Sequence, residues 1–259
     1  MSAEPSPAIR YVDAARGTID RIETSQLDAI QEAADLCAGI IVRGGLVHLF
    51  GSGHSRMAVE EMYPRYGSFP GFHPIVELSL SNHHQVVGAN GQRQAMFIEN
   101  VQGLGRVILG NFRLDPERDI MMVISASGSN AVPIDVALEA KRLGLTVIAI
   151  TSVEHSRLSS PKHSSGKRLF EIADLVIDTC TPPGDAAVDI AGLETPVAPL
   201  TSIASITIVN MIKAEVAQRL TEAGQPPIVL TSSVLVGDER SQELFEESYR
   251  EYRERTRRL

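Results

Sequence analysis

The chain has 259 residues, 43% of them hydrophobic, and a formal net charge of −8 at neutral pH. This length suits one α/β domain with additional helices or at most two small domains, and the acidic balance argues against nucleic acid as the main partner. No apolar run is long enough to cross a bilayer, and residues 1–7 lack the apolar core of a signal peptide. The two cysteines, Cys37 and Cys180, are far apart in the sequence, which argues against a disulfide framework or a zinc cluster. We therefore expect a protein of the reducing cytoplasm with no membrane partner.

Apolar periodicity and turn residues divide the chain into alternating helices and strands. A three/four spacing of apolar residues predicts a helix over 8–42, or a pair of helices broken near Gly17, which Arg43-Gly44-Gly45 ends. Beyond it we expect strands at 46–50, 73–76, 120–124, 146–150 and 175–178, and helices at 56–63, 92–111, 133–142, 198–220 and 238–258. Apolar strands that alternate with helices predict a doubly wound parallel sheet with right-handed crossovers. We interpret 1–43 as an N-terminal helical segment, 44–220 as the main domain and 221–259 as a C-terminal extension with a terminal helix.

Two further segments allow more than one interpretation. The helix at 198–220 is too apolar to face solvent, so it lies either at the centre of the fold or at a dimer interface. The polar stretch from His155 to Arg168 is a disordered excursion, a lid over the site or a plain surface loop.

Two short Ser/Gly-rich loops each follow an apolar strand and precede a helix. The first reads Gly-Ser-Gly-His-Ser at 51–55, and the second reads Ser-Ala-Ser-Gly-Ser-Asn at 125–130. Small residues let the backbone approach a ligand, while hydroxyls, N–H groups and the positive end of the following helix favour a phosphate. The serines have an alternative use as helix caps. Two such loops on neighbouring strands nevertheless favour a sugar-phosphate site, with substrate-binding candidates Ser52, Gly53, His54, Ser55, Ser125, Ser127, Gly128, Ser129 and Asn130.

The second loop and the helix and strand after it resemble a known family. The segment Val-Ile-Ser-Ala-Ser-Gly-Ser at 123–129, followed by Ala-Lys-Arg-Leu-Gly and a strand ending in Thr-Ser at 140–152, resembles the sugar isomerase (SIS) domain. The resemblance covers roughly 44–220 and implies a flavodoxin-like fold that binds phosphosugars, in dimers or tetramers with sites shared between chains. The chain looks most like an uncharacterised, phosphoheptose-isomerase-like bacterial branch. Some phosphoheptose isomerases use zinc, but a matching ligand set is not visible here, so we expect neither a metal nor another cofactor.

A shorter resemblance singles out Glu61. The segment Glu-Met-Tyr-Pro-Arg-Tyr-Gly at 61–67 is similar to Glu-Cys-Pro-Pro-Thr-Phe-Gly of the N-acetylmuramate 6-phosphate etherases, members of the same superfamily in which that Glu is a catalytic acid/base. This similarity implies a catalytic role for Glu61. The alternative is an ion pair between Glu61 and Arg56 or Arg65.

Glu99 is the other candidate carboxylate. It lies on an otherwise apolar segment that we expect to be helical, where burial would raise its pKa and suit it to remove a proton beside a carbonyl. The related etherases and isomerases also carry a working Glu on the corresponding helix. The alternatives are a surface Glu or a pair with Arg93. His83 and His84 are candidates for a general acid or a substrate hydrogen-bond donor, although each alone is more typical of a loop histidine.

Together these features predict a phosphosugar lyase. In this interpretation Glu99 and Glu61 share the base and acid roles, removing the C2 proton of an amino-sugar 6-phosphate such as N-acetylglucosamine 6-phosphate and expelling the C3 substituent. One alternative is an aldose–ketose isomerase, in which the same enolate is reprotonated at C1. A second alternative is a non-catalytic phosphosugar sensor, although the chain lacks the DNA-binding domain that such regulators carry. We expect a homodimer with shared active sites.

Overall fold

The structure is a computed structural model that describes residues 5–81 and 91–259. Its centre is a five-stranded parallel sheet in the order β2-β1-β3-β4-β5, the flavodoxin-like order. The strands are β1 (Leu46–Gly51), β2 (Phe72–Ile75), β3 (Asp119–Ile124), β4 (Thr146–Thr151) and β5 (Leu175–Asp178). The predicted α/β class and all five predicted strands are confirmed.

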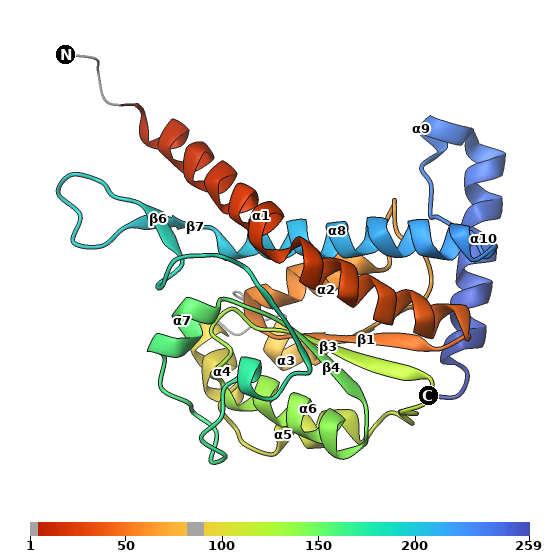
Figure 1. Ribbon diagram of the computed structural model, residues 1–259, viewed down its shortest axis with the longest axis horizontal. Coiled ribbons are helices and arrows are strands. Elements are labelled where there is room, and N and C mark those ends of the chain that lie inside the picture. Colours follow the sequence, from red (N-terminus) through yellow and green to blue (C-terminus); the bar gives the residue numbers. More distant parts are fainter. Residues whose placement is uncertain (1–4, 82–90) are drawn as a thin grey trace.

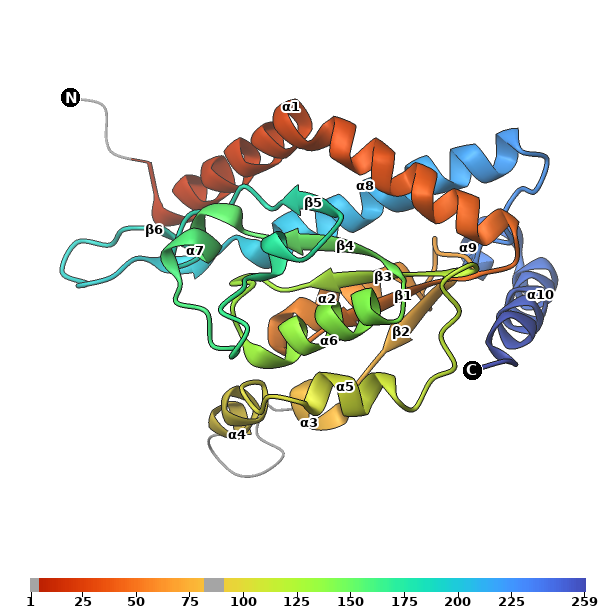
Figure 2. The same cartoon turned by 60° about the horizontal axis from the view of Figure 1, so that its bottom comes forward.

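Helices cover both faces of this sheet (Figures 1 and 2). One face is covered by α1 (Pro7–Val42), α2 (Arg56–Met62) and α8 (Thr201–Glu222), and the other by α5 (Leu104–Leu109) and α6 (Ala131–Arg142). Strand side chains alternate between the two: Met122 packs on the α1 and α8 side, and Met121 and Val123 on the α6 side. Burial on both faces explains why the strands read as continuous apolar runs. The remaining helical segments are η1 (Gly53–Ser55), α3 (Leu78–Ser81), α4 (Gly91–Ile98), α7 (Val153–Leu158), η2 (Leu169–Glu171), α9 (Ser233–Val236) and α10 (Asp238–Thr256).

The two long apolar helices pack against each other. α1 runs without interruption through Gly17, so the alternative of a break there is wrong; it ends as predicted, where the N–H groups of Gly44 and Gly45 bond to the Ile41 and Ile40 carbonyls. α8 buries Ile208, Ile212 and other apolar residues in its own chain, so it is a central helix. Its N-terminus follows a small hairpin of β6 (Ala186–Val188) and β7 (Val197–Pro199), which the sequence analysis did not predict.

The predicted helix over 92–111 is two helices. α4 ends at Ile98 and α5 begins at Leu104, with Gly103 between them in the left-handed region at φ 94°. The Gly103 N–H donates to the carboxylate of Asp135 on α6, so a long-range contact stabilises the break. The break matters because it places Glu99 in a turn beyond the end of α4.

The C-terminal helix α10 is fastened to the end of the sheet opposite the Ser/Gly loops. Tyr252 packs on Tyr63 with ring centroids 4.8 Å apart, and Arg255 donates to the Ile41 and Gly45 carbonyls at 2.9 and 3.1 Å. Arg258 pairs with both carboxylate oxygens of Asp119, which is fully buried at the start of β3. Burial would raise the pKa of Asp119, but the hydrogen bonds from Arg258 and the nearness of His48 hold it well below its usual range.

His73 lies beside this cluster. Its Nδ1 atom is 2.8 Å from Nδ1 of His48, whose Nε2 lies 3.4 Å from Asp119. Burial, and next the neighbouring His48, lowers the pKa of His73 to about 4, and the more distant Arg258 acts in the same direction against the opposing effect of Asp119.

This pKa predicts a loss of stability in mild acid. The pKa of His73 is about 6.5 in the unfolded chain and about 4 in the folded chain. At a pH between these values His73 is protonated in the unfolded chain and unprotonated in the folded chain. The free energy of unfolding should therefore fall as the pH drops through that window, by on the order of 2–3 kcal/mol from this one group. Urea unfolding of the wild type and of His73→Gln at pH 7, 6, 5 and 4 measures it. The variant should show the shallower decline, and parallel curves would contradict the assignment.

Candidate functional site

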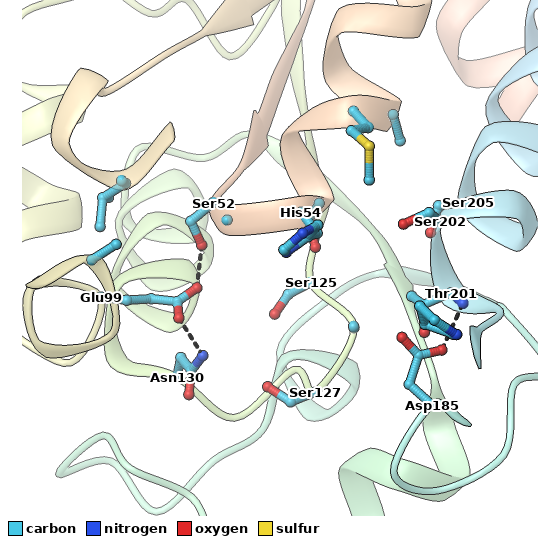
Figure 3. A pocket seen from close by; sticks show the side chains of 18 of the residues that line it. Ser52, His54, Glu99, Ser125, Ser127, Asn130, Asp185, Thr201, Ser202 and Ser205 are labelled. Carbon is cyan, nitrogen blue, oxygen red and sulfur yellow. Dashed lines mark hydrogen bonds between the residues drawn. The ribbon is translucent and has the colours of Figure 1, made fainter. Parts of the chain in front are cut away.

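The two Ser/Gly loops line one pocket. Strands β1 and β3 are parallel neighbours that end together, with Gly51 in register with Ile124, so the loops leave the sheet at the same edge. The pocket between them has a volume of about 470 Å³, a size typical of small-molecule sites. Figure 3 shows Ser52 and His54 on one side of the opening and Ser125 and Ser127 facing them.

Most of the predicted substrate-binding residues line this pocket, but two do not. Those that line it are Ser52, Gly53, His54, Ser55, Ser125, Ser127 and Asn130. Ser129 is only 2% exposed and does not line the pocket, so its contact with a phosphate remains a prediction. Gly128 is also buried, and its N–H donates to the Ser125 hydroxyl. Gly128 and Ser129 therefore shape the second loop rather than form the pocket wall.

Glu99 is held between the two loops. The Ser52 hydroxyl donates to its Oε1 atom, and the Asn130 amide donates to its Oε2 atom at 2.6 Å (Figure 3). Its carbonyl accepts from the Val132 N–H at 2.9 Å, which fixes the turn against the start of α6. Glu99 is half-buried and lines the pocket, so its carboxylate is placed where a bound molecule would meet it.

The orientation of Asn130 is set by two charged neighbours. Its Nδ2 atom donates to Glu99, and its Oδ1 atom accepts from the Lys162 ammonium at 2.7 Å. A carboxylate accepts only and an ammonium donates only, so the amide cannot flip without losing both bonds. Asn130 thus keeps one oxygen of Glu99 occupied and leaves the carboxylate in a fixed position.

The polar stretch from His155 to Arg168 is packed against the second loop. It begins inside the short helix α7, and the Lys162 N–H donates to the Ser129 carbonyl at 3.0 Å. Further along, the Leu169 N–H donates to the Gly128 carbonyl, and His163 contacts Asp135 at 3.0 Å. The stretch is therefore an ordered support for the loop that lines the pocket, and the alternative of a disordered excursion is wrong.

Glu61 lies outside this pocket. Its carboxylate accepts from Arg65 at 2.5 Å and from Asn210 at 3.0 Å, and it lines a neighbouring cavity beside Tyr249. Burial alone would raise the pKa of Glu61, but the hydrogen bonds from Asn210 and Arg65 outweigh it and hold the pKa below its ordinary value. The pair with Arg65, the alternative interpretation, is present. Within one chain the structure does not bring Glu61 and Glu99 together.

The far wall of the pocket carries groups that the sequence analysis did not assign. Asp185 lies on the side opposite Glu99, and its Oδ1 atom accepts from the N–H groups of Leu200 and Thr201 at the start of α8 (Figure 3). The hydroxyls of Thr201, Ser202 and Ser205 on α8 and the ring of His155 complete the wall. These residues are far from both loops in the sequence. The only sequence signal was the Pro-Pro-Gly turn that directly precedes Asp185.

Among the described residues that line this pocket there is no lysine or arginine. In the part of the chain that the structure describes, no group of three or more His, Cys, Asp or Glu side chains could hold a metal ion. His83 and His84 fall in 82–90, outside the described residues. The pocket therefore offers hydroxyl and N–H donors to an anion, and it has two carboxylates, Glu99 and Asp185, on opposite sides.

The comparisons with known proteins place the chain in a family. A model of the SIS domain matches residues 10–152, so the chain belongs to the SIS domain family and the resemblance seen in the sequence is confirmed. It is 34% identical to a UPF0309 protein of Thermoanaerobacter pseudethanolicus, over 97% of this chain and 99% of that one. It is also 34% identical to a UPF0309 protein of Geobacillus kaustophilus, over 90% of each.

Two solved structures are similar to this chain at lower sequence identity. A phosphoheptose isomerase from Francisella tularensis has 17% identity and a TM-score of 0.49, over 80% of this chain and 95% of that one. The sugar isomerase domain of an RpiR transcription factor from Sphaerobacter thermophilus has 18% identity and a TM-score of 0.49, over 95% of this chain and 99% of that one. No helix among the described residues is long and apolar enough to cross a membrane.

The two loop glycines give a matched test of how tightly the second loop is packed. Gly53 and Gly128 have nearly equal φ values of 56° and 57°, so alanine at either should cost about 1 kcal/mol of backbone strain. A Cβ atom at Gly53 meets open space, whereas one at Gly128 would lie 2.8 Å from the Thr151 hydroxyl and 3.0 Å from that of Ser156. Gly128→Ala should therefore reduce the free energy of unfolding by a further ~1–3 kcal/mol in urea titrations. Equal losses in the two variants would contradict the packing described.

Proposed function

We propose that this protein is a phosphosugar lyase that acts on an amino-sugar 6-phosphate such as N-acetylglucosamine 6-phosphate. The observation that carries the proposal is the position of the Glu99 carboxylate. Ser52 and Asn130 hold it between two Ser/Gly loops of the kind that binds phosphate. Removal of the proton beside a carbonyl needs a base held close to a bound sugar, and a positioned carboxylate serves this purpose. The SIS domain supports a phosphosugar as the molecule bound.

The phosphate and the sugar have separate places in this proposal. The phosphate binds to N–H groups of the Gly53–Ser55 segment and to the hydroxyls and N–H groups of Ser125–Ser127, near the N-terminus of α6. The single hydroxyl proton of Ser52 stays hydrogen-bonded to Glu99. The sugar then extends between Glu99 and the α8 wall, where Thr201, Ser202 and Ser205 supply hydrogen bonds to its hydroxyls. Asp185 already occupies the N–H groups at the start of α8, and its charge disfavours a phosphate there.

The reaction begins with transfer of the C2 proton to Glu99. The resulting enolate expels the C3 substituent, whose oxygen must take up a proton as it leaves. The etherase-like segment makes Glu61 the candidate donor of that proton. This role remains a prediction, because Glu61 lines the neighbouring cavity and its lowered pKa favours the ionised form. The same geometry favours a second candidate, an aldose–ketose isomerase, because that reaction needs no proton donor at C3.

The product and two matched variants distinguish these functions. Incubation with a panel of sugar 6-phosphates in deuterated water should yield an unsaturated, ultraviolet-absorbing product lighter than its substrate by water or by the C3 ether group. Glu99→Gln should reduce both C2 exchange and product formation by about 10²–10⁴-fold, because it removes the base and keeps the shape. Glu61→Gln should slow loss of the C3 group more than C2 exchange.

Three results would contradict parts of this account. An isobaric ketose 6-phosphate as the only product would replace the lyase with the isomerase. Normal turnover by Glu99→Gln would remove Glu99 from the role of base. Equal effects of Glu61→Gln on exchange and elimination would remove Glu61 from the role of acid and leave the lyase in place.

We also propose that the active form is a homodimer with shared sites. The support is the outer half of α1, which projects beyond the sheet in Figure 1 and exposes Ile9 by 52% and Val12 by 40%. Light scattering at micromolar concentration should give twice the chain mass of 28.0 kDa, and a double Ile9→Asp, Val12→Asp variant should dissociate. A wild-type monomer would end this part of the proposal.

A further inference from the structure

His155 lines the pocket but has no role in the proposed function so far. It lies in the first turn of α7, where its N–H donates to the hydroxyl of Ser152 at 3.4 Å. Ser152 is itself buried and donates to the Thr181 carbonyl at 2.9 Å. The start of α7 is thus fixed to the chain that follows β5, and His155 is half-buried and lines the pocket.

One ring nitrogen of His155 is already occupied. The backbone N–H of Gly184 donates to its Nδ1 atom at 3.1 Å. A backbone N–H can only donate, so Nδ1 must carry a lone pair and the ring proton must be on Nε2. This hydrogen bond therefore leaves Nε2 as the ring nitrogen that carries a proton and can donate a hydrogen bond.

The donor that fixes this tautomer sits in a rigid turn. Residues Pro182 to Asp185 form a turn closed by the Asp185 N–H on the Pro182 carbonyl at 3.1 Å. Gly184 is its third residue and has φ 81°, as a type II turn requires. The carboxylate of Asp185 anchors the turn to the start of α8 through Leu200 and Thr201. The Gly184 N–H is consequently held in place before any ligand arrives.

The proposed reaction forms a negatively charged oxygen, which the Nε2–H group of His155 can stabilise. When Glu99 takes the C2 proton, the C2–H electron pair forms a C1=C2 double bond and the carbonyl π electrons move to O1, which becomes an oxyanion. In the part of the chain that the structure describes, no lysine or arginine lines the pocket to stabilise that charge. A neutral imidazole N–H can stabilise an enolate oxygen, because a preorganised donor is strongest where charge develops.

We infer that His155 is a catalytic residue whose Nε2–H donates a hydrogen bond to the C1 oxygen of the sugar as the enolate forms. The electrons then return from O1 to restore the carbonyl, the C2=C3 bond forms and the C3–O bond breaks. The departing oxygen takes up one proton from the acid. Glu99 then releases the C2 proton to solvent, and solvent returns a proton to the acid, so both groups regain their starting state and the sum is loss of water. This inference rests on the proposed function, and it applies equally to the lyase and the isomerase because both pass through this enolate.

Two ligands distinguish oxyanion stabilisation from a merely structural role. The first is a five-carbon sugar hydroxamate phosphate, whose anionic oxygen mimics the enolate, and the second is glucitol 6-phosphate, which has no carbonyl. His155→Ala should weaken binding of the hydroxamate by about 10²-fold and leave glucitol 6-phosphate within about two-fold, measured by calorimetry. Glu154→Ala, the exposed neighbouring residue on α7 and outside the pocket, is the matched control and should change neither affinity.

Kinetics and NMR give two independent readouts. His155→Ala should lower C2 exchange and turnover together by about 10²–10³-fold at nearly constant KM. Nitrogen-15 spectra of the imidazole in the wild-type protein should show a proton on Nε2 and a lone pair on Nδ1. Equal weakening of both ligands, unchanged hydroxamate affinity or a proton on Nδ1 would overturn the inference.

Failure of the proposed function has a different signature. In that case the wild type would neither exchange C2 nor form product with any sugar 6-phosphate of the panel. The ligand pair and the NMR tautomer still report on His155, because neither requires turnover.

Discussion

The hydrogen bonds that hold the Glu99 carboxylate between Ser52 and Asn130 are the interaction on which the site depends. Each partner comes from a different loop, and each loop follows a different strand of the sheet. The two loops meet only because β1 and β3 are parallel neighbours that end at the same edge. A half-buried carboxylate needs such partners, since loss of one would leave a charged oxygen without a hydrogen bond. The carboxylate thus ties the loops together and is held by them.

The charges around the pocket determine where an anionic ligand can bind. Glu99 is on one side and Asp185 on the other, each with backbone or side-chain donors already committed to it. A phosphate must therefore bind away from both, against the serine hydroxyls and N–H groups of the loops. Lys162 reaches Glu99 only through Asn130 and does not line the pocket. Because the phosphate-binding groups carry no positive charge, the Glu99 carboxylate does not pair with a neighbouring cation. It is therefore available to act as a base.

Much of the fold could be predicted from the sequence because its signals are local. The strands are buried on both faces and read as apolar runs, and the small residues after β1 and β3 marked both loops. The failures involve distant partners. The helix predicted over 92–111 is broken at Gly103 by a contact with Asp135 of α6, and the carboxylate of Glu61 is held by Asn210 of α8. No spacing along the chain reveals either contact.

The far wall of the pocket was hidden for the same reason. His155 receives its hydrogen bond from Gly184, and Asp185 caps a helix that begins 16 residues later. In the sequence these residues belong to an ordinary polar loop and an ordinary turn. These residues lie beside the Ser/Gly loops only because the chain after β5 passes the ends of the strands from which those loops leave. The predicted half of the site is therefore the half that follows strands, and the rest depends on tertiary packing.

A crystal structure with a bound amino-sugar 6-phosphate tests the central claim most directly. The account predicts the phosphate within hydrogen-bond distance of Ser55, Ser125 or Ser127, with C2 of the sugar facing the Glu99 carboxylate. A phosphate bound at the start of α8 beside Asp185, or a sugar whose C2 faces away from Glu99, would contradict it.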